Sequence, residues 1–89
     1  MTRELMCPVC GFELGAPAWK GPSALDEICP SCGIHFGYDD FAGGNLAPRP
    51  DIYRKWRQRW IADGMRWFSR GRRMPSGWDP DKQLKQLEN

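Results

Sequence analysis

The chain has 89 residues, of which 40% are hydrophobic and 27% charged, so it has room for one small domain but not for a separate catalytic module. Its formal net charge is +2, and no apolar run approaches membrane-spanning length, which argues against a membrane protein. A core this small needs reinforcement, which four cysteines can provide as disulfides or as metal ligands. We therefore expect a single domain over residues 1–89.

The first residues carry no apolar stretch that could serve as a secretion signal. Met1 to Met6 include Arg3 and Glu4 and lead directly into a cysteine pair. We therefore expect a cytoplasmic protein, in which paired thiols favour a metal over a disulfide. A disulfide scaffold stays the less favoured alternative.

The cysteines form two C-x2-C pairs separated by 18 residues, which is the spacing of a four-cysteine zinc site. Both pairs open the same nine-residue frame, with Pro after the first cysteine and Gly after the second. We call residues 7–15 the first knuckle and residues 29–37 the second knuckle. The pattern predicts one zinc ion per chain, held by Cys7, Cys10, Cys29 and Cys32. Iron is the alternative, because four thiolates accept either metal, and an iron-loaded site of this type would make the protein a rubredoxin-like electron carrier.

Apolar and polar residues alternate after each cysteine pair, at Phe12 and Leu14 and again from Ile34 to Tyr38. This alternation favours short β-hairpins beside the knuckles, so we expect a zinc ribbon over residues 1–45. The Gly- and Pro-rich segment between the knuckles is expected to be a loop, with Trp19 folded back or exposed.

Two polar features near the knuckles are not expected to take part in chemistry. His35 is interpreted as a surface residue, because four thiolates already fill a tetrahedron. The adjacent acids Asp39 and Asp40 lie in a Gly-rich loop and are expected to be solvated. The sequence has no histidine paired with a plausible nucleophile, no phosphate-binding Gly motif and no helical metal motif with an open position. We therefore expect a protein that is not an enzyme and has no small-molecule substrate.

Residues 50–89 read as a helical, basic and aromatic extension packed on the ribbon. Asp51 is the predicted N-cap of an amphipathic helix that ends near Gly64, with Trp56 and Trp60 facing the core. A short second helix is predicted from Asp79 and Pro80, with Leu84 and Leu87 on one face. The fold class is thus a small metal-bound α+β protein.

Charge is unevenly distributed along the chain. Residues 1–48 carry two basic and six acidic groups, whereas residues 49–73 carry nine basic and two acidic groups. The basic part favours a protein partner, and nucleic acid is the alternative because Arg and Trp together suit phosphates and bases. The candidate partner-binding residues are Arg54, Arg57, Arg66, Arg70, Arg72 and Arg73.

The knuckle sequences, with Glu27 to Asp40, resemble the bacterial cysteine-rich CPCC-type zinc-ribbon proteins. The segments Tyr53 to Trp56, Trp60 to Ser69 and Trp78 to Leu84 extend this resemblance over most of the chain. The chain departs from the family's usual double-cysteine turn in having Val9 and Ser31 inside its knuckles, which leaves the four metal ligands intact. Some such proteins lie in polymorphic-toxin loci, so the resemblance implies an immunity protein that inhibits a toxin domain.

Overall fold

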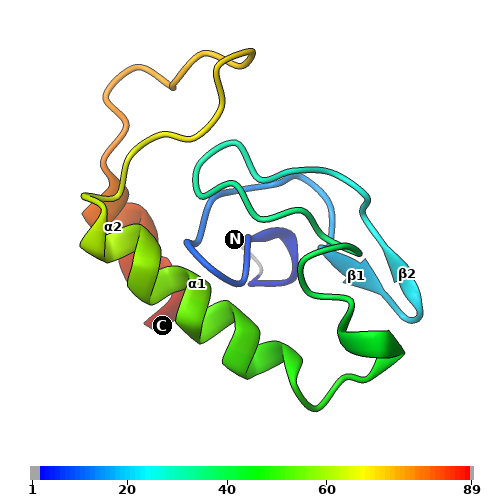
Figure 1. The fold of residues 1–89 in the computed structure, drawn as a ribbon. Coiled ribbons are helices and arrows are strands. Elements are labelled where there is room, and N and C mark those ends of the chain that lie inside the picture. The colour runs from blue at the N-terminus through cyan, green and yellow to red at the C-terminus, as the bar shows by residue number, and fades with distance from the viewer. Residues whose placement is uncertain (1–2, 89) are drawn as a thin grey trace.

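Helices α1 and α2 lie along one side of the two knuckles, and a long loop joins the two helices (Figure 1). The structure is a computed structural model that describes residues 3–88. The elements run in the order η1 (Arg3–Leu5), β1 (Trp19–Lys20), β2 (Ser23–Ala24), η2 (Ala42–Gly44), α1 (Arg49–Ala62), α2 (Pro80–Lys85) and η3 (Gln86–Glu88). The protein is therefore a small α+β fold. Within residues 3–88, no helix combines the length and the apolar character needed to cross a membrane.

The strands differ from the predicted positions. The one sheet of the described residues is a two-stranded antiparallel hairpin, β1–β2, in which Trp19 pairs with Ala24. It lies in the segment predicted to be a loop. Each predicted knuckle hairpin is reduced to a single bridge, Met6 with Glu13 and Ile28 with His35. The physical reason is the glycine that closes each frame, Gly15 and Gly37, whose φ of 80° and 86° ends the extended path.

Helix α1 begins earlier than predicted. Its N-cap is Pro48, and Asp51 lies inside the first turn, not at the cap. There Asp51 pairs with Arg54 and, at 3.2 Å, with Lys55. The shift is physically reasonable, because prolines are tolerated in a first turn and an acid there complements the helix dipole. Gly64, with φ of 93°, follows the helix end as predicted.

The prediction for the second helix is confirmed at its start. Asp79 is the N-cap of α2, and its side chain accepts a hydrogen bond of 3.2 Å from the Lys82 amide. Pro80 occupies the first turn. The helix is short and continues into η3.

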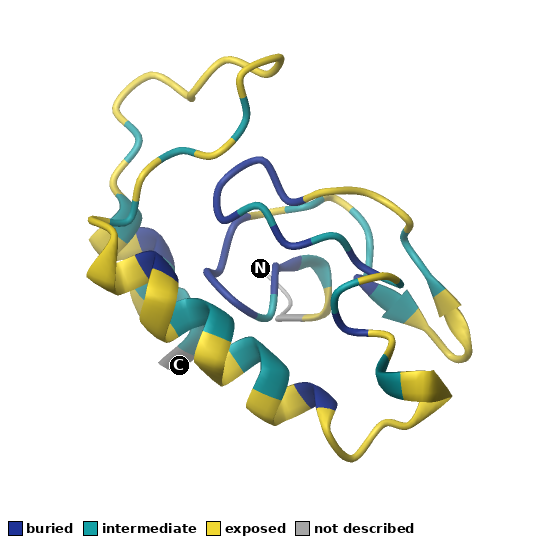
Figure 2. Ribbon diagram, in the orientation of Figure 1, coloured by how far each residue is buried: buried dark blue, intermediate teal, exposed yellow. Residues whose placement is uncertain are grey.

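The core lies between the knuckles and α1, and most buried residues belong to the first 40 positions (Figure 2). Val9, Ile34 and Phe36 are fully buried, and Trp60 of α1 joins them at 6% exposure. Trp56 packs against this cluster only in part. The prediction that α1 docks through its tryptophans is therefore confirmed for Trp60, with Trp56 at the edge.

Asp40 is not solvated as predicted but fully buried, and it ties the hairpin to α1. Its carboxylate accepts hydrogen bonds from Trp19 Nε1 at 2.8 Å, Tyr53 Oη at 2.6 Å and the Gly37 amide at 2.6 Å. The Arg49 guanidinium covers the Trp19 ring, with Cζ 3.6 Å from the centroid. Burial, and then the contact with Asp40, raises the pKa of Tyr53, so its hydroxyl stays a donor. Trp19 is thus folded back.

Candidate metal centre and the groove beside it

The two knuckles bring all four cysteine sulfurs together. The Sγ atoms of Cys7, Cys10, Cys29 and Cys32 lie within 4.8 Å of one another, and all four residues are buried. The distances from Cys7 to Cys32 and from Cys10 to Cys29 are both 3.7 Å. A tetrahedron with metal–sulfur bonds of about 2.3 Å has sulfurs about 3.8 Å apart, whereas a disulfide bond is about 2.05 Å long. All four cysteines are free thiols, and their spacing fits a metal ion.

The repeated frame of the sequence is also a repeated geometry. The Gly11 amide donates to Cys7 O and the Gly33 amide to Cys29 O, both at 2.9 Å. Each first cysteine in turn donates its amide to the residue after the glycine, Phe12 O or Ile34 O. Both glycines have a φ of 84°, which a residue with a Cβ adopts only with strain. Two nearly identical turns therefore hold the ligands.

The surroundings of the sulfurs shift the pKa values of the thiols in opposite directions. Burial raises the pKa of the Cys7 and Cys32 thiols, whereas hydrogen bonds from the neighbouring thiols, Cys10 first, lower the pKa of Cys29. Four buried thiolates need a bound cation, and the chemistry of this ligand set suits zinc or iron.

Side chains of both helices satisfy the backbone carbonyls of the first knuckle. Arg57 donates from Nη2 to Pro8 O and from Nε to Val9 O, both at 2.7 Å. Gln83 of α2 donates from Nε2 to Cys10 O at 3.2 Å. A fixed guanidinium fork spanning two adjacent carbonyls holds the turn from outside.

The matching carbonyls of the second knuckle are also satisfied, but by different donors. The Trp56 indole Nε1 donates to Cys32 O at 2.9 Å. The other donors are the Phe68 and Ser69 amides, which bind Pro30 O at 3.1 and 2.9 Å, with Phe68 also 3.2 Å from Ser31 O. The C-terminal half therefore supplies hydrogen-bond donors to the same three positions of both knuckles.

The C-terminal half also packs directly on the knuckle glycines. A Cβ added at Gly11 would lie 2.3 Å from the backbone oxygen of Gln83, and one added at Gly33 would lie 2.5 Å from the Phe68 ring. A larger residue at Gly11 would therefore meet backbone, and one at Gly33 would have to displace the Phe68 ring. The candidate metal centre is consequently enclosed by its own chain on both sides.

His35 does not join the sulfur cluster. Its Nε2 lies 3.1 Å from Asp26 Oδ1, and its ring stacks on Tyr38. The cluster of possible metal ligands that the described residues form consists of the four cysteines alone. Asp39 caps the second knuckle by accepting a hydrogen bond of 2.8 Å from the His35 amide.

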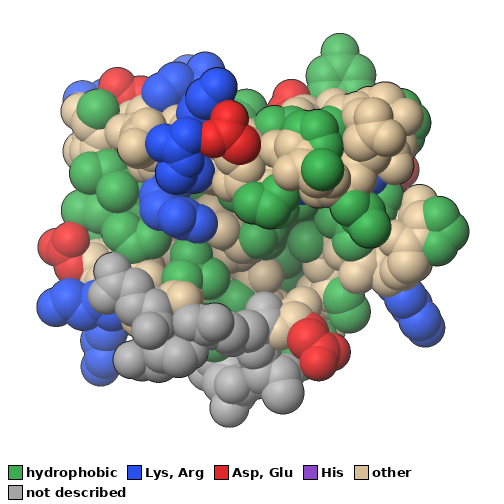
Figure 3. Space-filling view, turned by 90° about the horizontal axis from the view of Figure 1, so that it is seen from below, with side chains coloured by type: hydrophobic (Ala, Val, Ile, Leu, Met, Phe, Trp, Pro, Cys, Tyr) green, Lys and Arg blue, Asp and Glu red, His purple; other side chains and the backbone are tan. Residues whose placement is uncertain are grey.

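The six candidate partner-binding arginines occupy different environments. Arg57 is half-buried and engaged with the first knuckle, as described above. Arg54 is exposed and paired with Asp51, and Arg72 lies over the Phe12 ring at 5.6 Å. Arg66, Arg70 and Arg73 are exposed. On the face seen from below in Figure 1, Lys and Arg side chains gather in a band beside an acidic side chain, with exposed hydrophobic side chains nearby (Figure 3).

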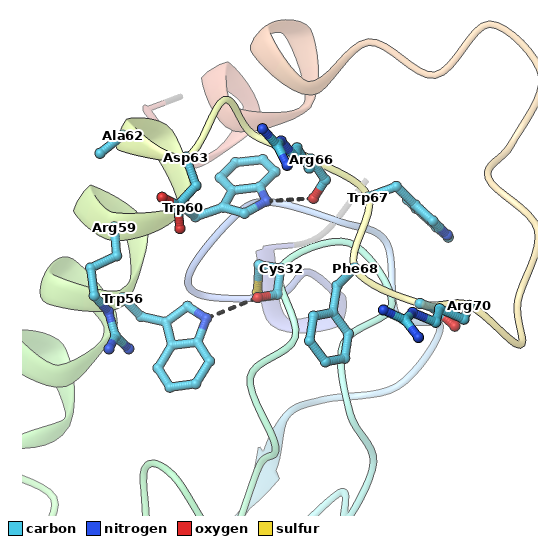
Figure 4. A pocket seen from close by; sticks show the side chains of 11 residues that line it. Cys32, Trp56, Arg59, Trp60, Ala62, Asp63, Arg66, Trp67, Phe68 and Arg70 are labelled. Atoms are coloured by element: carbon cyan, nitrogen blue, oxygen red, sulfur yellow. Dashed lines mark hydrogen bonds between the residues drawn. The ribbon is translucent and has the colours of Figure 1, made fainter.

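A groove of about 1190 Å³ lies beside the second knuckle, between the end of α1 and the segment that follows it (Figure 4). Its aromatic residues are Trp56, Trp60, Trp67 and Phe68, its charged residues are Arg59, Asp63, Arg66 and Arg70, and Cys32 lies at its base. Arg66 and Arg70 are among the predicted partner-binding residues, whereas Arg59 and Phe68 were not predicted to take part. The helical spacing of Trp56 and Arg59 was a usable signal, and the Arg59 Cζ indeed lies 4.7 Å from the Trp56 centroid.

Comparison of the chain with protein-family models, with curated proteins and with solved structures finds no match.

Proposed function

We propose that the protein is a non-catalytic zinc protein, with one zinc ion held by Cys7, Cys10, Cys29 and Cys32 in a zinc-ribbon-like site, that acts as a protein–protein interaction module. The main observation in support of the zinc centre is the pair of 3.7 Å distances between sulfurs of a buried cluster of four cysteines. Such distances fit a tetrahedral ion of this size. Iron stays the alternative metal.

A structural role for the ion follows from its ligand number. Four thiolates complete a tetrahedron, so no position is left for water or substrate. The knuckle carbonyls around the cluster are already bonded to α1, α2 and residues 68–69. The ion would hold the two halves of the chain together, and function would then reside on the surface.

The basic surface supports binding of a protein. Residues 49–73 carry nine basic and two acidic groups, and Arg66, Arg70 and Arg73 are exposed. A charged surface of this kind suits an acidic partner, since complementary charge speeds association and sets specificity. The resemblance to the CPCC-type proteins favours one version of this proposal, in which the partner is a toxin domain and the protein its inhibitor.

Nucleic acid binding is the second candidate, and the groove is the observation that favours it. Arginines beside aromatic rings are the usual composition of a single-strand site. All five indole N–H groups, however, are already bonded inside the chain, to Asp40, Cys32 O, Arg66 O, Arg72 O and Gln83. Trp60 is buried, and the Arg59 guanidinium lies over the Trp56 ring, so few ring faces are free to stack on bases.

Four measurements test the proposal. Metal analysis of protein made without added metal should give one zinc per chain, and full iron occupancy with zinc supplied would contradict the zinc assignment. Affinity capture should recover a protein at a stoichiometric ratio, and co-expression should protect cells if that protein is a toxin. Submicromolar and steeply salt-dependent binding of single-stranded or duplex nucleic acid, without any protein partner, would favour the second candidate.

A further inference from the structure

We infer that the groove beside the second knuckle is the docking site for an extended acidic segment of the partner, anchored by one aromatic side chain between Trp56 and Phe68. This inference rests on the proposed function and names its site and its ligand. The groove volume, about 1190 Å³, exceeds the usual range of about 300–1,000 Å³ for small-molecule pockets. A groove of this size can accommodate a peptide segment.

The charges along the groove are unbalanced. Arg59, Arg66 and Arg70 line it, opposed by Asp63 as its one acid. Among the side chains that the structure describes, those of residues 4–87, no carboxylate lies at ion-pair distance from these three guanidinium groups. This differs from Arg54 and Lys55 on the same helix, which share Asp51. Guanidinium groups bind carboxylates through paired hydrogen bonds, so the groove is complementary to an acidic chain.

Two aromatic rings frame the place for an anchor. In Figure 4 the rings of Trp56 and Phe68 lie on either side of Cys32, with Arg59 beside Trp56 and Arg70 beside Phe68. Phe68 is 56% exposed although its ring packs on Gly33 from behind. An exposed aromatic ring supported on its other side is a typical contact residue for an aromatic or large apolar side chain.

The second knuckle fixes this frame before any partner arrives. The Phe68 amide is held by Pro30 O and Ser31 O, and the Trp56 indole by Cys32 O. Rings that are already in place cost less entropy on binding than free side chains do. The metal-binding turn thus serves as the scaffold of the groove.

A protein segment fits better than single-stranded nucleic acid. Stacking of successive bases requires several free ring faces, and Phe68 is the large exposed ring that the groove offers. Asp63 on the rim would repel phosphates, whereas a peptide can place a polar or basic residue beside it. An extended peptide that carries several carboxylates and one aromatic residue matches all of these features.

The experiment uses the zinc-loaded full chain and a capped octapeptide with acidic residues on both sides of one phenylalanine. When extended, this peptide spans roughly 26 Å, comparable with the 36 × 29 × 25 Å extents of the protein. Binding is followed by the indole N–H signals in ¹H–¹⁵N spectra. We expect saturable binding with a Kd below about 1 mM at near-physiological salt. Trp56 and Trp60 signals should shift, with Trp19 and Trp78, outside the groove, as internal controls.

Charge reversal locates the contact. Arg70→Glu and Arg66→Glu should each weaken binding about tenfold or more, while Arg73→Glu, with the same charge change outside the groove, should weaken it less than about threefold. Replacement of the peptide's phenylalanine by serine should weaken binding about tenfold. Amide dispersion of each variant reports that the fold is intact.

Four outcomes would overturn the inference: no saturable binding, equal losses for Arg70→Glu and Arg73→Glu, shifts confined to Trp19 or Trp78, or tighter binding of an oligothymidylate of equal charge. A captured partner that binds Arg66→Glu and Arg70→Glu as it binds the parent would refute the groove and leave the interaction module standing. Failure to capture any partner, with nucleic acid bound instead, would refute the proposed function itself.

Discussion

The two knuckles share a sequence frame and an internal geometry, but they differ in what covers them. The first knuckle is covered by both helices. The Arg57 guanidinium donates to two of its carbonyls, and the Gln83 backbone of α2 packs against Gly11. The second is held by the Phe68 and Ser69 amides, with the Phe68 ring over Gly33. Its Cys32 is 6% exposed and lies at the base of the groove, whereas Cys10 is fully buried. One copy of the duplicated turn is therefore covered by packing, whereas the other copy borders an open groove.

The residue inside each turn shows how the two copies are joined. Val9 is apolar and fully buried, while its counterpart Ser31 accepts a hydrogen bond of 2.9 Å from Gln83 Nε2. The same Gln83 nitrogen donates to Cys10 O of the first knuckle. One amide from α2 thus bridges both turns, which a valine at both positions would not permit.

The largest expected effect tests what the knuckles have in common. Cys7→Ser and Cys29→Ser each remove one of the four thiolates that we propose to share a zinc ion, so both variants should lose the ion and leave the chain unfolded. The binding energy of a structural zinc is on the order of 10 kcal/mol or more, greater than the total stability of most small domains. Circular dichroism and metal analysis would measure this, with Met74→Ser at an exposed position as the control. A Cys29→Ser protein that keeps dispersed amide signals would show that the ion is not what holds the fold.

An intermediate effect should separate the two copies. Gly11→Ala and Gly33→Ala both place a Cβ at a φ of 84°, which costs about 1–2 kcal/mol. At Gly11 the new methyl group also meets backbone oxygen, so α2 must move, and we expect a total loss of about 3–5 kcal/mol. At Gly33 it meets the Phe68 ring, which can swing into solvent, so we expect about 1–3 kcal/mol and a disturbed groove.

Urea unfolding of the glycine variants measures this difference. Gly71→Ala is a suitable control, because its Cβ would meet no atom within 4 Å and its φ is not in the left-handed region. A greater loss at Gly33 than at Gly11 would mean that Phe68 is the more rigid cover. The packing difference between the two knuckles would then be the reverse of the one described.

Local patterns in the sequence predicted the local features of the fold. The spacing of the cysteines identified the four sulfurs that meet, and Asp79 with Pro80 identified the start of α2. These signals depend on residues a few positions apart. The positions of the strands were not predicted, because alternation after each cysteine pair suggested hairpins that Gly15 and Gly37 cut short.

Contacts between residues far apart in the chain could not be predicted from the sequence. Asp40 is buried because Trp19 and Tyr53 converge on it, and these two residues lie 21 and 13 positions away. Arg57 meets carbonyls 48 and 49 positions away, so on a helix wheel it was indistinguishable from the exposed Arg54. The groove has the same origin, since it forms only when residues 66–70 return to the second knuckle.

Arg57 gives the smallest and most specific of these tests. Arg57→Ala removes both donors from Pro8 O and Val9 O, and because the site is only half-buried, water can replace part of them. We expect Arg57→Ala to lower the free energy of unfolding by about 1–3 kcal/mol. For Arg54→Ala we expect about 0–1 kcal/mol, because its exposed pair with Asp51 contributes little. Arg57→Lys should fall between them, since an ammonium group cannot span two carbonyls as the planar guanidinium does.

Urea unfolding and partner binding should be measured on the same three variants, because the two readouts distinguish a structural from a recognition role. If Arg57 is structural, Arg57→Ala loses stability while the folded fraction binds partner as the parent does. Equal stability of Arg57→Ala and Arg54→Ala, combined with weaker partner binding by Arg57→Ala alone, would instead return Arg57 to the contact surface. The first knuckle would then resemble the second, with recognition on both copies of the turn.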